Sequence, residues 1–196
     1  MPHPDDAWEG VNADARSMDV RGAKSVFAVA LVALLGALAA PAAHSTKAEN
    51  RVALSSLESG VLSDLNKIRV EHGLEPVKIS ARLTASAAQH SKEMGADGYF
   101  EHDSHDGTVF WKRIGRWYGS SGYSFWSVGE NLLWSSPQVD PDGAMQLWMN
   151  SPEHRANILN ARWREIGISA VHFASAPGTY KGLEVTIITT DFGIRH

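Results

Sequence analysis

Three polar residues have side chains that can do chemistry and neighbours that are aromatic or apolar. His102 lies two residues after Phe100, Glu130 precedes the run Asn131–Trp134, and His154 follows a Ser-Pro-Glu tripeptide. Neutral imidazoles bind metal ions and accept protons, and a carboxylate in apolar surroundings needs a partner. For Glu130 that partner is either a set of backbone amides, or a histidine or metal ion. The three residues define a candidate site that only the fold can assemble.

His154 is the most informative of the three by its position. Ser151 as N-cap and Pro152 as the first helical residue would place His154 inside the first turn of a helix. The positive end of the helix dipole disfavours an imidazolium there, so a neutral ring is expected. The plainer alternative is a histidine that only packs near a helix end, just as His102 could be a surface loop residue. The wide separation of the two histidines makes no local metal motif.

Several standard chemistries are excluded by the sequence. It contains no Gly-x-Ser-x-Gly, no His-Glu-x-x-His and no phosphate-binding glycine loop, which removes the usual hydrolase and nucleotide interpretations. The absence of cysteine removes thiolate zinc sites, cysteine nucleophiles and disulfides. With a net charge of -4 and no block of basic residues, the chain is not expected to bind nucleic acid.

The N-terminal part of the chain predicts export. An uncharged run over 26–40 follows basic residues and ends in a small-x-small triplet, which is typical of a secretory signal peptide cleaved after Ala42. The alternative is an uncleaved membrane anchor over 26–43. The acidic lead before Met18 is atypical of a signal peptide, so we expect translation to start at Met18. The predicted organisation is an N-terminal extension with signal peptide at 1–42, a linker at 43–54 and one domain at 55–196.

The expected location of the domain is outside the cell or in the cell envelope. An exported chain without cysteine is more typical of a bacterium than of an animal or plant. Membrane contact is expected only if the N-terminal segment stays uncleaved.

The elements that position the three residues follow from hydrophobic periodicity. Apolar residues recur at helical spacing in four stretches, a Ser-Pro opening like that of the fourth helix indicates a short fifth one, and two runs rich in Val, Ile and Thr close the chain as strands. Helices followed by a hairpin indicate an α+β domain with helices covering an antiparallel sheet. The expected helices are 57–72, 81–94, 108–117, one beginning at 141 and 152–159, and the expected strands are 131–134, 165–173 and 183–191.

Other residues have plainer explanations. The six tryptophans beyond the signal region are more typical of core packing than of a groove for a sugar or lipid. His90 lies on the apolar face of its helix and is expected to be a hydrogen-bonded core residue. Asp191, near the end of the last strand, could be a second buried carboxylate.

Short motifs then occur in a fixed order over nearly the whole domain, from about Leu57 to Gly193. They are Leu65-Asn66-Lys67-Ile68-Arg69, His90-Ser91-x-x-Met94, Phe100-x-His102, Gly129-Glu130-Asn131, Trp148-x-x-Ser151-Pro152-x-His154-Arg155-x-Asn157-Ile158-Leu159, Ile166-Gly167-Ile168 and Asp191-Phe192-Gly193. In this order the chain resembles the bacterial branch of the CAP superfamily of cysteine-rich secretory, antigen five and pathogenesis-related one proteins, also called the SCP domain.

The resemblance implies a three-layer α-β-α sandwich with a central antiparallel sheet and a surface cleft. Members of the family often place two histidines and two glutamates in that cleft, and in several the histidines bind zinc or another divalent ion. By motif, His102 matches the first histidine, Glu130 the first glutamate and His154 the second histidine.

The place of the second glutamate, three residues after Trp148, holds Ser151 in this chain. Ser151 therefore joins the cleft residues, with helix capping as its expected role. A mechanism that needs paired carboxylates would require Glu153 or Asp191 as the substitute.

Three classes of function follow from these observations. The first is a monomeric binding domain whose cleft takes a divalent cation, zinc first, a small or lipid-like ligand, or an envelope protein, with no organic cofactor. The second is a hydrolase in which a metal ion on His102 and His154 activates water and Glu130 is the general base. The third is a structural envelope domain without a ligand.

Overall fold

The computed structural model describes residues 15–21 and 52–196. The apolar run 26–40, the expected cleavage point at Ala42 and most of the expected linker lie outside the described residues. Within the described ranges, no helix combines the length and the hydrophobicity that a membrane crossing needs.

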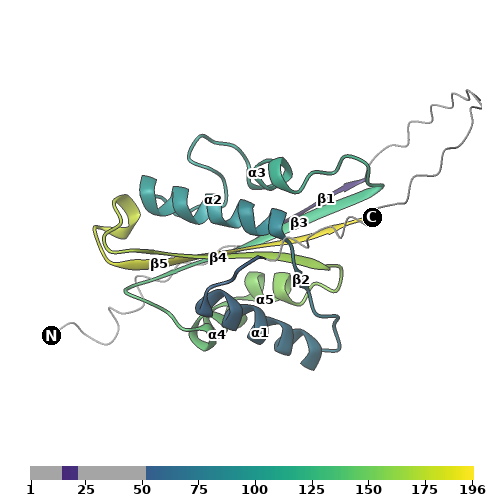
Figure 1. The fold of residues 1–196 in the computed structure, drawn as a ribbon, viewed down its shortest axis with the longest axis horizontal. Coiled ribbons are helices and arrows are strands. Elements are labelled where there is room, and N and C mark those ends of the chain that lie inside the picture. Colours follow the sequence, from purple (N-terminus) through teal and green to yellow (C-terminus); the bar gives the residue numbers. More distant parts are fainter. Residues whose placement is uncertain (1–14, 22–51) are drawn as a thin grey trace, which may run out of the picture.

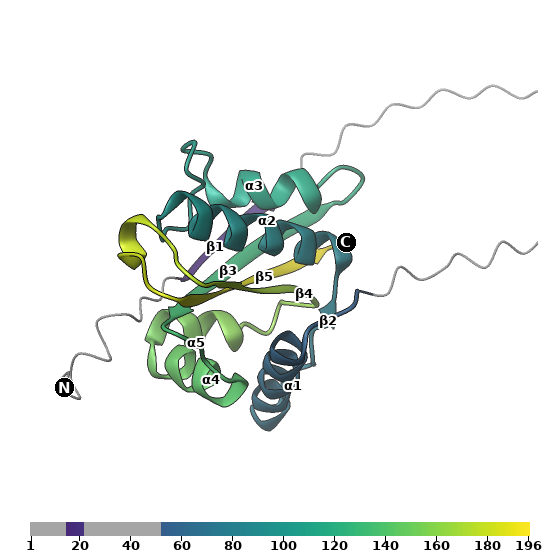
Figure 2. The ribbon, with the colours of Figure 1, turned by 60° about the vertical axis from the view of Figure 1, so that its left-hand side comes forward.

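The domain has three layers, with one sheet between two groups of helices. Figures 1 and 2 show α2 and α3 on one face of the sheet and α1, α4 and α5 on the other. This arrangement confirms the expected α+β sandwich. The helices are α1 (Ser56–Glu71), α2 (Ala81–Asp97), α3 (Phe110–Trp117), α4 (Pro141–Asn150) and α5 (Pro152–Ile158), with a short 3-10 turn η2 (Gly178–Tyr180).

The sheet has the strand order β1-β3-β5-β4-β2. Neighbouring strands are antiparallel except at β2, which adds a parallel pair of two residues beside β4. The strands are β1 (Ala15–Arg21), β2 (Lys78–Ile79), β3 (Phe125–Ser135), β4 (Glu165–Phe173) and β5 (Val185–Arg195).

Strand boundaries agree with the sequence expectation only in part. Strand β4 has the expected bounds, whereas β5 begins two residues later than expected and continues to Arg195. Strand β3 is much longer than the predicted 131–134. Because β3 is buried on both faces, its residues do not alternate between apolar and polar, and periodicity could not reveal it.

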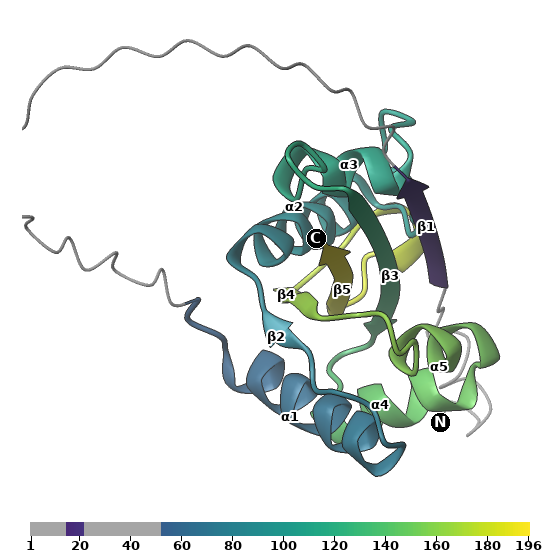
Figure 3. The same ribbon diagram turned by 90° about the vertical axis from the view of Figure 1, so that its right-hand side faces the viewer.

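Strand β1 was not expected from the sequence. Its residues belong to the part of the chain assigned to the N-terminal extension, yet the structure pairs them antiparallel with Phe125–Asn131 of β3. Figure 3 shows β1 along the outer side of the sheet, next to β3.

The core fills both spaces between the sheet and its helices. On the side of α1, α4 and α5 it is built around Trp148, Trp163 and Phe192, and on the side of α2 and α3 around Leu83 and Ile114. Most of the tryptophans serve packing, as expected. Trp126, Trp134, Trp148 and Trp163 are buried, Trp111 is half-buried and Trp117 is exposed.

Candidate functional site

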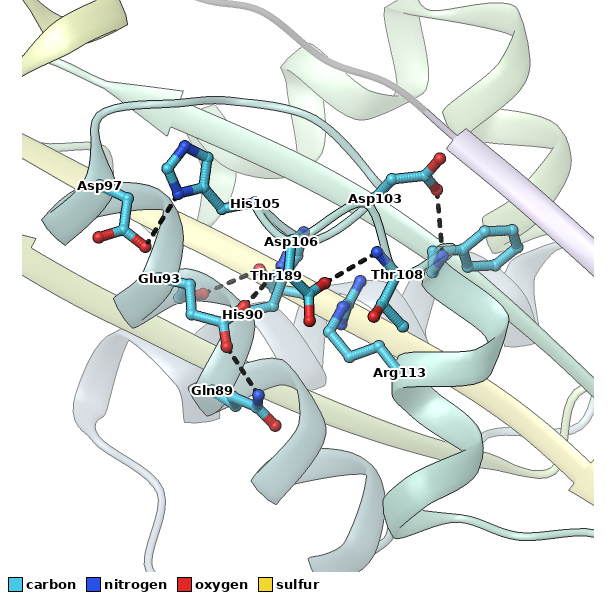
Figure 4. Close-up of polar contacts among 12 residues, drawn as sticks. Gln89, His90, Glu93, Asp97, Asp103, His105, Asp106, Thr108, Arg113 and Thr189 are labelled. Atoms are coloured by element: carbon cyan, nitrogen blue, oxygen red, sulfur yellow. Dashed lines mark hydrogen bonds and ion pairs between the residues drawn. The ribbon is translucent and has the colours of Figure 1, made fainter.

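His102 is carried by the loop between α2 and α3, and local hydrogen bonds hold this loop. Figure 4 shows Asp103 and Asp106 turned toward the start of α3. Asp103 accepts a hydrogen bond from the Phe110 amide at 3.1 Å, and Asp106 accepts one from the Thr108 amide at 2.8 Å. The loop is therefore anchored on both sides of its turn, which fixes the backbone from which His102 points inward.

His90 of α2 forms a hydrogen bond with the same loop. It lies on α2, is fully buried, and its Nε2 is 2.9 Å from the carbonyl oxygen of Glu101. His90 is thus the hydrogen-bonded core histidine expected from the sequence.

Glu130 is held by two partners at the centre of β3. Its Oε1 is 2.7 Å from Nδ1 of His102, and its Oε2 accepts a hydrogen bond from Nη2 of Arg113 at 2.6 Å. The same Nη2 donates to the His102 carbonyl oxygen at 3.0 Å. All three side chains are buried. The sequence left backbone amides, a histidine or a metal ion as possible partners of Glu130. In the structure the partners are a histidine, His102, and an arginine, Arg113.

The electrostatics keep Glu130 ionised. Burial alone would raise the pKa of this carboxyl, but the Arg113 guanidinium, the electrostatic interaction with His90 and the hydrogen bond from His102 together lower the pKa below its usual value. Because an ionised carboxylate only accepts hydrogen bonds, the proton in the His102 contact belongs to Nδ1.

His154 has a matching local partner in Ser151. Ser151 is the N-cap residue of α5 but makes no side-chain bond to the helix backbone, contrary to the capping role expected from the sequence. Its Oγ instead lies 2.7 Å from Nδ1 of His154, and it donates to Glu153 Oε2 at 3.3 Å. The serine therefore orients the imidazole, and the expected placement of His154 in the first turn is what brings the two together.

The two halves of the site meet at Glu130-Asn131 on β3. Nδ2 of Asn131 donates to the carbonyl oxygen of His154 at 3.2 Å. Asn157 of α5 donates to the Glu130 carbonyl oxygen at 3.1 Å and to Asn131 Oδ1 at 2.9 Å. Because successive side chains of a strand point to opposite faces, Glu130 faces α3 while Asn131 faces α5.

The position of α5 depends on a buried arginine of α1. Nη1 of Arg69 donates to the carbonyl oxygens of Ile158 at 2.6 Å and Asn160 at 3.1 Å, and its Nε donates to that of Glu75 at 3.0 Å. The end of the helix that carries His154 is thereby fixed to the end of α1.

The structure thus forms two contact pairs, His102 with Glu130 and Ser151 with His154, joined through the β3 backbone. Both histidines are buried. In the described part of the chain, no group of three or more His, Asp or Glu side chains is arranged to hold a metal ion. An open hollow of about 410 Å³ lies elsewhere, between the first residues of α1 and α4, and none of the four site residues lines it.

Of the two residues considered as a second carboxylate, Asp191 lies beside the site. Asp191 of β5 is the register partner of Glu130 on β3, and both side chains are fully buried. Glu153 is exposed and reaches the site only through Ser151.

Two residues of the site were missed by the sequence reasoning. Arg113 lies on the inward face of α3, which the spacing of Phe110 and Ile114 already indicates, so its burial could have been inferred. Oδ1 of Asn157 also accepts a hydrogen bond from Nε1 of Trp163 at 3.1 Å. Apart from the family motif, nothing in the sequence indicated this bridging role of Asn157.

Comparison with known proteins decides the family. The model of the Cysteine-rich secretory protein family, CAP, matches residues 62–185. The chain belongs to this family. The resemblance found through the motifs is confirmed, and the matched range contains His102, Glu130, Ser151 and His154.

Two relatives of this CAP domain come from Bacillus subtilis (strain 168). The uncharacterized protein YkwD is 34% identical over 123 residues, which are 62% of this chain and 45% of YkwD. The uncharacterized membrane protein YlbC is 29% identical over 140 residues, which are 68% of this chain and 36% of YlbC. The chain spans less than half the length of both relatives.

Solved structures agree with the CAP assignment. An extracellular protein containing an SCP domain from Bacillus anthracis str. Ames is 27% identical, with a TM-score of 0.50 over 72% of this chain and 44% of that protein. An outer surface protein from Borrelia burgdorferi, 18% identical, has a TM-score of 0.52 over 69% of this chain and 90% of its own. The latter shows the shared fold.

Proposed function

We propose that this chain is an exported CAP domain that binds a divalent cation through His102 and His154. Export is supported by the family and by the Bacillus anthracis relative, which is an extracellular protein. The apolar run over 26–40 supports the same location. Zinc is the first ion to test, because imidazole nitrogen is among its preferred ligands.

The observation that carries the proposal is the matched fixing of the two imidazoles. In each ring Nδ1 is engaged at 2.7 Å, by Glu130 in His102 and by Ser151 in His154. Glu130 is ionised and can only accept, and Ser151 donates its own proton to Glu153. In a neutral ring these contacts favour the proton on Nδ1 and the lone pair on Nε2, and such a second-sphere arrangement is typical of histidines that bind metals.

His102 and His154 would hold the cation, and Glu130 and Ser151 would keep their rings oriented. Two imidazoles leave coordination positions for water or a further ligand, and a bound cation would act there as a Lewis acid. The proposal concerns binding, because the chain's own residues do not supply a third protein ligand within the described ranges.

The hydrolase alternative with Glu130 as general base has weaker support. One oxygen of Glu130 accepts from Arg113 and the other contacts His102, so both are already engaged. A carboxylate with a lowered pKa is also a poor proton acceptor near neutral pH. We assign Glu130 a positioning role.

Calorimetric titration of Zn²⁺, Cu²⁺ and Mg²⁺ into the full chain tests the proposal. Wild type should bind Zn²⁺ saturably near one equivalent, and the His102→Ala/His154→Ala variant should not. A matched control is His72→Ala/His105→Ala, which removes two exposed histidines and should leave binding unchanged.

Equal titrations for wild type and the His102→Ala/His154→Ala variant would overturn the cation proposal. If the titrations are equal and Glu130→Ala loses much stability, a structural domain is favoured. If the titrations are equal and the stability of Glu130→Ala is unchanged, the domain should be tested for binding to lipid vesicles and envelope proteins.

A further inference from the structure

The hollow between the first turns of α1 and α4 is separate from the two histidines of the proposed cation site, and its volume is about 410 Å³. Figures 2 and 3 show the two helices side by side on one face of the sheet. The sheet contributes Ala170 of β4 and Thr186 of β5 to the lining, and every lining residue lies within 52–196. Small-molecule sites typically have volumes of about 300–1,000 Å³, so the hollow is large enough for a compact ligand.

Contacts within the domain fix the helical walls of this hollow. Glu58 of α1 accepts hydrogen bonds from the Ser55 amide at 2.7 Å and from the Ala170 amide at 2.9 Å. The start of α1 is therefore fastened to β4. A Cβ added to Gly60 would overlap the ring of Pro141, so α1 and α4 also touch each other closely. Walls that are already fixed lower the cost of ordering a binding site.

The turn before α4 forms another wall and is held from both sides. Ser135 donates a hydrogen bond to the carbonyl oxygen of Gln138 at 3.2 Å. Thr186 of β5 donates one to the carbonyl oxygen of Pro137 at 3.3 Å. The backbone that carries the Gln138 side chain is thereby attached to the sheet.

Three side chains of the hollow keep hydrogen-bonding capacity that the described residues do not use. The Gln138 amide and the Ser56 hydroxyl are exposed and make no hydrogen bond with that part of the chain. Asp140 accepts from the Gly143 amide through Oδ1 at 2.7 Å, which leaves Oδ2 available. The hollow therefore offers a ligand both donors and acceptors, including one carboxylate oxygen.

The chemistry of the lining argues against three classes of ligand. Neither lysine nor arginine lines the hollow, and its histidine, His172, already lies 3.4 Å from Glu184, so an anion would find no unpaired cation. Asp140 is the one carboxylate among the lining residues, which is too few for a metal ion that prefers oxygen ligands. An apolar ligand would remove water from Gln138 and Asp140 without replacing its hydrogen bonds.

A neutral ring with hydroxyl groups and C–H faces matches what remains. Apolar side chains, among them Leu57 and Val139, line the hollow beside the polar ones. We propose that this hollow is a binding site for a neutral sugar. Gln138 and Asp140 bond its hydroxyl groups, and Leu57 and Val139 pack against its ring. The inference does not depend on cation binding.

Amide NMR of the full chain tests the class of ligand. The probes are methyl glucoside, methyl galactoside, methyl mannoside and N-acetylglucosamine, with glucuronate and cyclohexanol as the anionic and apolar comparators. At least one neutral sugar should shift the amides of 55–57, 138–140 and 170–172 saturably, with a dissociation constant in the millimolar range. No shifts with any of the four sugars at tens of millimolar, or equal or larger shifts with a comparator, overturn the proposal.

Two substitutions test the residues that would bond the sugar. Asp140→Asn keeps the helix cap, because asparagine caps as well as aspartate, but it removes the charged acceptor. Gln138→Ala removes the amide. Each should weaken sugar binding about tenfold. The matched controls Asp142→Asn and Gln146→Ala change exposed residues of α4 outside the lining and should leave binding unchanged. Equal weakening in test and control variants overturns the proposal.

A third variant fills the hollow and does not depend on the cap. Ser56→Trp places a large ring at the exposed first residue of α1, so it should abolish sugar binding while circular dichroism stays unchanged. The His102→Ala/His154→Ala variant should bind the sugar as wild type does, which separates this test from that of the cation site. Sugar binding that survives in Ser56→Trp, or that is lost in His102→Ala/His154→Ala, places the sugar elsewhere and overturns the proposal.

Discussion

Glu130 and Asp191 face each other across β3 and β5, and both carboxyl groups are fully buried. Arg113 is the guanidinium that neutralises Glu130. Within the described residues, neither oxygen of Asp191 has a hydrogen bond of ordinary geometry. Burial raises the pKa of Asp191 above its ordinary value and the negative charge of Glu130 raises it further, while Arg113 offsets only part of this. Of the two carboxyl groups, Asp191 is therefore the one whose protonated form the surroundings favour.

We predict that Asp191→Asn stabilises the domain increasingly as pH rises. The folded pKa of Asp191 lies above the unfolded value of about 3.9, so its stabilising contribution is complete below pH 4. That contribution is lost by about 1.4 kcal/mol per pH unit as the pH rises toward the folded pKa. Asparagine has the shape of the protonated acid and no titration, so it avoids this loss.

Urea unfolding of wild type and Asp191→Asn between pH 4 and pH 8 measures the difference. The gap in unfolding free energy should be smallest at pH 4 and should widen in favour of Asp191→Asn. A gap that is constant with pH would mean that Asp191 is ionised in the folded state.

We predict strong coupling between Arg113 and Glu130. Arg113→Met alone leaves the Glu130 carboxylate buried without its cation, and Glu130→Gln alone leaves the guanidinium unpaired. Each should cost about 3–5 kcal/mol. The Arg113→Met/Glu130→Gln double variant should lose far less than the sum, because no unpaired charge is left. Denaturant unfolding of the four proteins checks this, and additive losses would contradict it.

The helices and half of the site could be predicted from the sequence for a physical reason. Helices α1 to α4 each have an apolar face at helical spacing, α5 is indicated by its Ser-Pro opening, and most of the five begin or end next to proline or glycine. His102 and Glu130 were found because they are polar residues near apolar ones, and His154 because Ser151 and Pro152 place it in the first turn of a helix. Arg113 was overlooked although it shares the inward face of α3.

The rest depends on contacts distant in sequence. Strand β3 carries Ser127, Glu130 and Asn131 among apolar residues, and only the pairing with β5 and the burial of both faces make it a strand. The partner of Ser151 could not be inferred either, since an N-cap serine ordinarily bonds the helix backbone. Its turn toward His154 depends on the side-chain geometry of α5.

We predict that Ser151→Ala changes the tautomer of His154 and weakens zinc binding. Without the serine oxygen, Nδ1 of His154 loses its acceptor at 2.7 Å, and the proton is free to move to Nε2. Loss of such a second-sphere partner typically lowers metal affinity by about 10–100-fold. Nitrogen-15 NMR of the imidazoles and zinc calorimetry measure the two effects. The Ser175→Ala variant, which alters an exposed serine outside the site, is the control. Unchanged tautomer and affinity in Ser151→Ala would remove the serine from the site.

We predict that Gly167→Ala severely destabilises the domain. Strand β4 passes directly beneath α2 at this point, and an added Cβ would meet backbone atoms of Leu83 and Thr84. Backbone cannot rotate away as a side chain can, so the strand and the helix must separate, at a cost of about 3 kcal/mol or more. The matched control is Gly115→Ala in α3, where the nearest atom outside the helix belongs to Trp126 at 3.9 Å. That substitution should stabilise by about 0.5–1 kcal/mol through helix propensity. Thermal unfolding of both variants beside wild type should move the midpoints in opposite directions, and a neutral Gly167→Ala would show that the contact between β4 and α2 is looser than the structure has it.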